Sequence, residues 1–267
     1  MTKTLKRQRI WELDFLRGLA IIMMVFDHFM FDFAYLPNYF SNFYEVNHPL
    51  FNWLNDFARL YWNSLLRYFG REFFVLLFLL ISGISFTFSK DNFKRGTKMF
   101  VVALLITLVT YIIDLTLNFG VFIVFGVIHM FAVNTLIVAI MRKFIKNELI
   151  LLFIGMTIIT VSLIFGFFTP TPLHQLSLSE LPNIIIGLKS YGADHFGILP
   201  YLGIILVGTV VGKTFYEQRV SMVPQVQLSS RNIFLLTGKY SLYVYVIHQP
   251  IVLAIVAIFA YGFGYRF

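Results

Sequence analysis

The sequence predicts an all-α integral membrane protein built as a bundle of about seven transmembrane helices. Of the 267 residues, 58% are hydrophobic and only 13% are charged, whereas a soluble domain is near half apolar and a quarter charged. Five apolar stretches of about 20 residues carry few or no charges, which is the length that an α-helix needs to cross a bilayer. This pattern excludes a protein with a single anchor, a transmembrane β-barrel and a disordered chain.

The chain contains no cysteine. Thiol nucleophiles, thiolate metal sites, iron–sulfur clusters and disulfides are therefore excluded, and any chemistry must come from other side chains. We predict no metal site. The net charge of +8 does not indicate nucleic acid as a partner, because in a membrane protein the distribution of the cations matters more than their sum.

The first predicted helix runs from about Asp14 to Leu36. It follows a basic tail but is too long for a signal peptide, contains ionisable residues and lacks a cleavage site, so it should be retained. The polar, aromatic-rich connection at 37–71 has the composition of a lid in the membrane interface. Six further helices are centred near Leu80, Leu108, Phe131, Thr157, Leu206 and Ile251.

Lys and Arg residues predict the orientation, because cytoplasmic loops retain cations. Fifteen of the 21 lie in the N-terminal tail (Lys3, Lys6, Arg7 and Arg9) and in segments 90–98, 142–146 and 213–239. Five lie in connections on the other side. This alternation requires seven crossings, a cytoplasmic N-terminus and an external C-terminus. Because the chain shows no internal repeat, we predict one domain, 1–267.

The first helix carries the densest set of intramembrane ionisable residues. Asp14, Arg17, His28 and Asp32 fall within a stripe about 120° wide on a helical wheel, and Asp27 lies about 80° away on its flank. Such a stripe is either a buried seam of salt bridges that orients the helix or the lining of a water-accessible cavity. Since ionisable groups are costly in a bilayer, three kinds of them on one face favour a functional role.

Spacing within the stripe suggests roles. His28 and Asp32 are one helical turn apart, and a carboxylate can fix the tautomer of an imidazole. Arg17 lies 11 residues before His28, about 16 Å along the axis, so the two residues can address the two ends of one elongated ligand.

Two further histidines lie on apolar helices. His129 has no polar companion on its face and is predicted to form an interhelical hydrogen bond. His248 shares a face with Ser241 and Tyr245, and both a structural and a functional role stay open for it. Five cations lie near the predicted cytoplasmic end of the helix bundle: Lys90, Lys94, Arg95, Arg231 and Lys239. The excess of cations in cytoplasmic loops and contacts with anionic lipid headgroups are enough to explain them. A polyphosphate-bearing cofactor that enters from the cytoplasm would also contact them.

Several blocks of the chain resemble the heparan-alpha-glucosaminide N-acetyltransferase catalytic-domain-like family, within the wider transmembrane acyltransferase superfamily. The first block is RIWELDFLRGLAII at 9–22, followed by the DHF of 27–29. FLLISGISF (78–86), KRG (94–96), FGVIH (125–129), LPYLG (199–203) and GKYSLYVYVIHQP (238–250) agree in order. The first and last blocks are specific, and together the blocks cover most of the chain from residue 9 to about 255.

The resemblance implies transfer of an acetyl or other short acyl group from cytoplasmic acyl-CoA to an acceptor across the membrane. The acceptor is commonly an amine or hydroxyl of a sugar. In the wider superfamily, the residues tied to activity correspond to Arg17 and His28 of this chain. Animal members place their active histidine just beyond the first helix, where this chain has His48 without their motif, so His28 is the better choice here.

These residues suggest a mechanism. Because a thioester is already activated, the enzyme needs to hold it, to deprotonate the acceptor and to stabilise the oxyanion. We expect His28, oriented by Asp32 or Asp27, to be the general base, and Arg17 to bind the pantetheine or phosphate end of CoA.

Other residues are predicted to bind the acyl-CoA. Ser241, Tyr245 and His248 would hydrogen-bond near the thioester, and Lys94, Arg95 and Lys239 would contact the cofactor at the cytoplasmic side.

Two competing functions are a proton-coupled transporter or flippase with Asp27, His28 and Asp32 as a relay, and a non-catalytic scaffold or receptor. We expect membrane lipid, acyl-CoA and a glycan or small-molecule acceptor as partners, and a multi-pass location in a bacterial plasma membrane. The sequence leaves open the acceptor, the acyl length, N- or O-transfer, an acyl-histidine intermediate, which of the three histidines faces the thioester and the oligomeric state.

Overall fold

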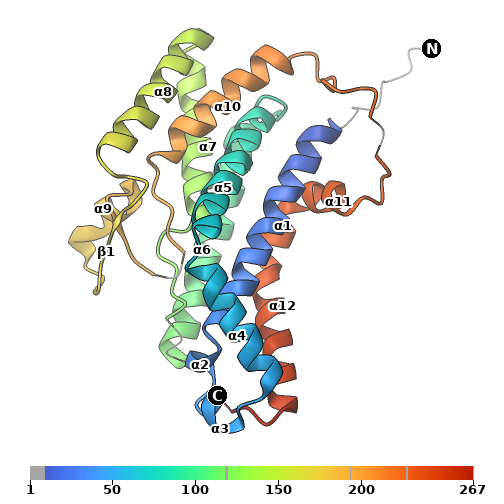
Figure 1. Ribbon diagram of the computed structural model, residues 1–267. Helices are drawn as coiled ribbons and strands as arrows, with labels where there is room; N and C mark the ends of the chain where they lie inside the picture. Colours follow the sequence, from blue (N-terminus) through green and yellow to red (C-terminus); the bar gives the residue numbers. More distant parts are fainter. Residues whose placement is uncertain (1–9, 118–119, 193, 227, 267) are drawn as a thin grey trace. The chain divides into compact units, whose positions relative to one another are not determined.

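The computed structural model describes residues 10–117, 120–192, 194–226 and 228–266 and is almost entirely helical (Figure 1). Among these described residues, four helices are long and apolar enough to cross a membrane: Leu65–Phe86, Asn92–Thr116, Val127–Phe144 and Ser241–Gly262. Glu148–Ile164 and Tyr201–Phe215 are shorter apolar helices. The prediction of an all-α, multi-pass membrane protein is confirmed, whereas the count of seven crossings and the orientation stay predictions. The basic tail residues fall outside the described residues.

Each segment predicted to cross the membrane is helical in the structure. The helices are α1 (Trp11–Ala34), α2 (Leu36–Tyr39), α3 (Phe43–Val46), α4 (Pro49–Trp62), α5 (Leu65–Phe86), α6 (Asn92–Leu117), α7 (Val127–Phe144), α8 (Glu148–Ile164), α9 (Leu181–Ile186), α10 (Tyr201–Phe215), α11 (Ile233–Lys239) and α12 (Ser241–Gly262). A 3-10 turn, η1 (Leu178–Glu180), and two short parallel strands, β1 (Thr171–Pro172) and β2 (Lys189–Ser190), complete the description.

The chain divides into two compact units. The first comprises Met1–Phe78 and Arg219–Phe267, and the second comprises Leu79–Gln218. The single domain expected from the sequence stays a prediction.

In the first unit, the N-terminal half of α1 packs closely against α11. A Cβ atom added at Gly18 would lie 1.8 Å from the carbonyl oxygen of Phe234, and one added at Gly238 would lie 1.8 Å from that of Asp14. Only glycine fits at these two positions, because the backbones themselves are in contact.

We therefore expect Gly238→Ala to lower the free energy of unfolding by about 1–3 kcal/mol, the usual cost of overpacking. Gly70→Ala is the matched control, since an added Cβ there meets nothing within 4 Å and alanine is the better helix former. Thermal unfolding of both variants in detergent checks the prediction. Equal stability of the two would show that this contact is not tight.

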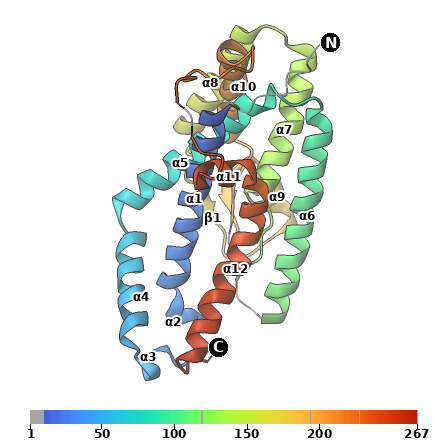
Figure 2. The ribbon, with the colours of Figure 1, turned by 90° about the vertical axis from the view of Figure 1, so that its right-hand side faces the viewer.

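The connection predicted at 37–71 is largely helical, and it ends earlier than expected because α5 already begins at Leu65. Its main element, α4, runs antiparallel along the C-terminal half of α1 (Figures 1 and 2). The buried side chain of Asn55 donates to the carbonyls of Phe33 and Ala34 at 2.8 and 3.0 Å. These are end carbonyls of α1 that lack helical partners, so α4 also caps α1.

An aromatic core closes this end of the first unit. It joins side chains of α1 to α4, of α12 and of the C-terminal segment: Met30, Phe33, Leu36, Phe40, Phe43, Phe51, Ala58, Val256, Ala260 and Tyr265. Tyr265 is only 1% exposed. Apolar burial of this size holds α1 and α12 in register next to the polar residues that they share.

In the second unit, α6 packs on α7, and α10 packs on α7 and α8. The end of α5 crosses α10 at two glycines, where a Cβ added at Gly83 or Gly208 would approach a backbone oxygen of the other helix to 2.4 Å. In the connection after α8, the Asp194 carboxylate accepts from the backbone N–H of Val127, and His195 Nε2 donates to the Ile184 carbonyl. Burial lowers the pKa of His195.

Candidate functional site

The structure brings two of the predicted residues, His28 and His248, into direct contact. They lie on α1 and α12 within the first unit, and their ring centroids are 4.8 Å apart in an edge-to-face arrangement. His28 is half-buried and His248 is 8% exposed. Two histidines 220 positions apart in the chain thus form one imidazole pair.

Backbone hydrogen bonds assign the tautomers of this pair. His28 Nδ1 lies 2.9 Å from the Met24 carbonyl oxygen, and His248 Nδ1 lies 2.6 Å from that of Tyr245. Because a carbonyl only accepts, each Nδ1 carries the proton and each neutral ring has its lone pair on Nε2. Backbone carbonyls of α1 and α12 therefore fix the tautomers of the two rings, a role that the sequence analysis expected of a carboxylate. Both rings are oriented to act as bases through Nε2.

Asp32 does not hydrogen-bond to His28. Its fully buried carboxylate accepts from Gln249 Nε2, at 3.0 and 3.1 Å to its two oxygens, and from the Tyr39 hydroxyl at 3.3 Å. The expectation that Asp32 fixes the His28 ring directly is not met, because its side chain turns toward α12. Instead, Asp32 ties α1 to α12 through Gln249, the residue that follows His248.

Asp27 is also engaged elsewhere. Arg67 donates to both of its oxygens at 3.0 and 3.1 Å, and the Tyr61 hydroxyl donates to one of them at 3.1 Å. The Arg67 guanidinium also lies 3.5 Å from the centre of the Trp62 ring. Asp27 thus anchors the start of α5 to α1, and its carboxylate does not hydrogen-bond to the His28 ring.

Arg17 lies at the other end of the stripe. It donates to Asp14 at 2.9 Å and to the Gly238 carbonyl at 3.5 Å, and its side chain is 16% exposed. At this position the stripe therefore contains a salt bridge, as its interpretation as a seam of ion pairs predicts.

Contacts with the chain before α11 fix the start of α1. The buried Glu12 carboxylate accepts from the Ser221 hydroxyl at 2.8 Å and from the Met222 N–H at 2.7 Å. Trp11 Nε1 donates to the Val223 carbonyl at 3.1 Å. Within the block at 9–22, Trp11 and Glu12 thus have a structural role, directly before the ion pair of Asp14 and Arg17.

The other predicted cofactor-binding residues fall into two groups. Ser241 and Tyr245 lie on the first turns of α12, where the Tyr245 ring is 5.8 Å from that of His248, and the Lys239 ammonium lies 4.9 Å from the Tyr240 ring. Lys94 and Arg95 lie on the first turn of α6, in the second unit. Their role stays a prediction.

His129 forms the interhelical hydrogen bond expected of it. Its Nδ1 accepts from the Gly126 N–H at 3.2 Å, so its Nε2 donates to Thr107 on α6 at 2.9 Å. The Thr107 hydroxyl then donates to the Ile123 carbonyl at 2.8 Å. Nε2 thus joins α7 to α6, while Nδ1 caps the start of α7, and the predicted interhelical hydrogen bond is confirmed.

Gln249 and Arg67 hold the site together but are not among the residues predicted from the sequence. Gln249 is a polar side chain inside an apolar helix, and the rule that such residues are costly in a bilayer would have singled it out. Arg67 has no comparable signal, because a cation near a helix end is ordinary in a membrane protein.

Comparison with known proteins gives one match. Residues 9–250 match the family described as heparan-alpha-glucosaminide N-acetyltransferase, catalytic. No curated protein and no solved structure matches the chain. The match extends from the start of α1 through the imidazole pair to the proline that follows Gln249, and so covers every predicted site residue. The chain therefore belongs to the heparan-alpha-glucosaminide N-acetyltransferase catalytic family of membrane acetyltransferases.

Proposed function

We propose that this protein transfers an acetyl or other short acyl group from cytoplasmic acyl-CoA to an amine or hydroxyl of a glycan or related acceptor across the membrane. The observation that carries the proposal is the contact of His28 with His248, two imidazoles that each direct Nδ1 at a backbone carbonyl and Nε2 away from it. Family membership supports acetyl transfer as the reaction type.

His28 is the proposed general base. Its Nε2 takes the proton from the acceptor nitrogen or oxygen as that atom attacks the thioester carbonyl, while its Nδ1–H stays on Met24. The tetrahedral intermediate then collapses, the bond from carbon to sulfur breaks, and the proton passes from His28 to the departing thiolate. The hydroxyl groups of Tyr245 and Ser241, on the same helix as His248, contribute hydrogen bonds to the thioester and the oxyanion, and His248 lies beside His28 with Nε2 as a hydrogen-bond acceptor.

The proposed topology has seven crossings, a cytoplasmic N-terminus and an external C-terminus, in the plasma membrane of a bacterium. The distribution of Lys and Arg supports it. In this topology Arg17 and Lys239 lie on the cytoplasmic side of the imidazole pair, and we propose that Arg17 contacts the phosphate or pantetheine part of acyl-CoA. Lys94 and Arg95 are further proposed contacts of the phosphates.

Binding of acyl-CoA tests the proposal without an acceptor. At a ligand concentration of about 100 times Kd, acyl-CoA should stabilise the protein by about 2.7 kcal/mol, which a thermal shift in detergent reads out. In Arg17→Gln, we expect most of the shift to be lost while the protein stays folded. Arg266→Gln is the matched control, since Arg266 is an exposed cation at the C-terminus.

The shift must survive in Arg266→Gln. A wild-type protein that acyl-CoA does not stabilise would remove acyl-CoA as the donor. An unchanged shift in Arg17→Gln would remove only the role of Arg17.

The competing transporter would need a proton path through Asp27, His28 and Asp32. Each of these side chains turns to a different partner, Arg67, Met24 and Gln249 respectively, and none of the three hydrogen-bonds to another. This arrangement favours local chemistry at the imidazole pair over a relay.

A further inference from the structure

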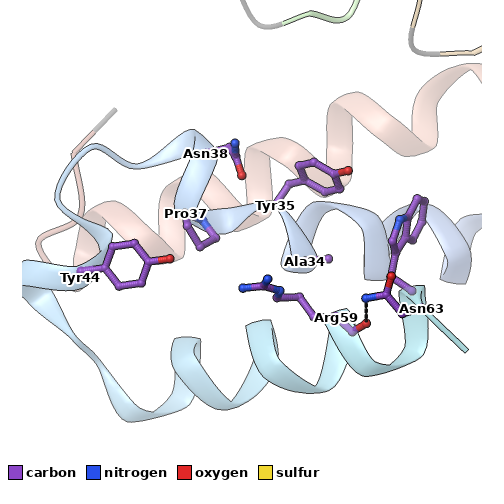
Figure 3. A pocket seen from close by; sticks show the side chains of 8 residues that line it. Ala34, Tyr35, Pro37, Asn38, Tyr44, Arg59 and Asn63 are labelled. Carbon is purple, nitrogen blue, oxygen red and sulfur yellow. Dashed lines mark hydrogen bonds between the residues drawn. The ribbon is translucent and has the colours of Figure 1, made fainter. Parts of the chain in front are cut away.

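A pocket of about 410 Å³ lies in the first unit where α1 ends beside α4 (Figure 3). Its polar and aromatic lining comes from the end of α1, from α2 and α3 and from the end of α4: Tyr35, Asn38, Tyr44, Arg59, Trp62 and Asn63. None of these residues belongs to the site proposed for acyl transfer. Tyr and Trp are the side chains that membrane proteins place at the level of the lipid headgroups, so the pocket has the composition of a site at the membrane surface.

Arg59 gives the pocket its positive charge. Its backbone carbonyl accepts from the Asn63 side chain at 2.9 Å, but its guanidinium makes no hydrogen bond or ion pair with the part of the chain that the structure describes. Asp56, one turn earlier on α4, does not line the pocket. Figure 3 shows the guanidinium pointing along α4 toward Tyr44. Because the planar fork of an arginine matches the oxygens of a phosphate, Arg59 is available to a ligand that carries one.

The wall at the end of α4 is held in place by contacts that do not use the Arg59 guanidinium. The Arg67 guanidinium lies 3.5 Å from the centre of the Trp62 ring, and Arg67 is itself bound to Asp27 on α1. The ring of Tyr35 meets that of Trp62 edge to face, with the centroids 6.4 Å apart. A ligand therefore meets walls that are already ordered, which lowers the entropic cost of binding it.

An exposed apolar surface follows the pocket directly along the chain. The first turns of α5 begin two residues after Asn63, and they expose Leu65, Leu66 and Phe69 by 75%, 78% and 65%. Because α5 is long and apolar enough to cross a membrane, its start lies at the membrane surface, where such side chains contact acyl chains. A lipid with a phosphate headgroup can contact Arg59 and this surface at once, whereas a water-soluble anion can use only Arg59.

We propose that this pocket binds the phosphate of an anionic membrane lipid, with its acyl chains along the start of α5. Arg59 contacts the phosphate, and the side-chain amides of Asn38 and Asn63 can donate to other oxygens of the headgroup. The bound lipid links the end of α1 to α3 and α4 and so stabilises this end of the first unit. It is not consumed in the acyl transfer, and the proposal does not depend on the proposed function.

Lipid binding to the full-length protein in detergent tests the proposal. The probes are dioleoyl phosphatidylglycerol, dioleoyl phosphatidylcholine and glycerol phosphate, which has the same phosphate without acyl chains, and the thermal shift during each titration gives Kd. We expect phosphatidylglycerol to bind about tenfold more tightly than phosphatidylcholine, whose choline offsets the phosphate charge; this is the effect of one hydrogen bond to a charged group. Arg59→Gln should abolish the preference. Arg266→Gln removes an exposed cation of the same unit outside the pocket and should retain it.

Leu66→Gln tests the placement of the acyl chains. It should weaken the binding of both lipids to a similar extent and leave their ratio unchanged, because Leu66 faces the chains and not the headgroup. Equal Kd values of the two lipids for the wild type, or the same loss of preference in both arginine variants, would overturn the proposal. Glycerol phosphate that binds as tightly as phosphatidylglycerol would show a site for free anions and reject the lipid as its ligand.

Discussion

His28→Ala should lower kcat for acyl transfer by a factor of about 100 to 10,000, the usual contribution of a positioned general base. The side chain makes no hydrogen bond to another side chain, since its one hydrogen bond within the described residues is to the Met24 carbonyl. The variant should therefore fold and still bind acyl-CoA, so that KM for acyl-CoA changes little. Release of free CoA thiol in the presence of an acceptor amine measures the rate.

His129→Gln is the control for this experiment. His129 joins α7 to α6 through Thr107 and caps the start of α7 through the Gly126 N–H, so its replacement should lower the melting temperature and leave kcat close to that of the wild type. His28→Ala with wild-type kcat would end the assignment of His28 as the base. If His248→Ala then lost activity instead, the base would be the other member of the imidazole pair.

Arg67→Ala should be the most destabilising single change in the first unit. Arg67 and Asp27 are only 18% and 14% exposed, and removing the cation leaves a largely buried carboxylate with the Tyr61 hydroxyl as its remaining partner. Breaking a buried pair from one side costs about 3–5 kcal/mol. Thermal unfolding in detergent should show a correspondingly lower melting temperature.

Two further variants separate charge from geometry at this pair. Arg67→Lys keeps the cation but loses the two parallel hydrogen bonds and the stacking on Trp62, so its stability should fall between the wild type and Arg67→Ala. Adding Asp27→Asn to Arg67→Ala should recover part of the loss, because the uncompensated charge is then gone. A double variant as unstable as the sum of the single ones would contradict a coupled pair.

Local patterns predicted a good part of this protein. Apolar runs of bilayer length correctly located the helices, because a helix satisfies its own backbone hydrogen bonds. The isolated position of His129 correctly predicted an interhelical hydrogen bond. The stripe on the first helix correctly located Arg17 and His28 on one face, because helical periodicity depends only on neighbouring residues. The resemblance of the first and last blocks to the acetyltransferase family was confirmed by the family match.

Partners of the polar residues were not predictable in the same way. Periodicity placed Asp32 one turn from His28, but the direction of its side chain depends on Gln249, 217 positions away. The connection after α1 was expected as a lid, yet α4 packs along α1 because Asn55 and an aromatic core attach it there. Arg67 carried no signal that its guanidinium belongs to Asp27.

The sequence by itself thus determined a membrane-embedded helical protein, its family, and a polar first helix with Arg17 and His28 on one face. Only the tertiary structure decided that His28 meets His248, that backbone carbonyls rather than carboxylates orient both rings, and that Asp27 and Asp32 bind α1 to its neighbours. The physical reason is one of range. Hydrophobicity and helical periodicity are properties of adjacent residues, whereas a hydrogen-bond partner is chosen among all the groups that folding brings within about 3 Å.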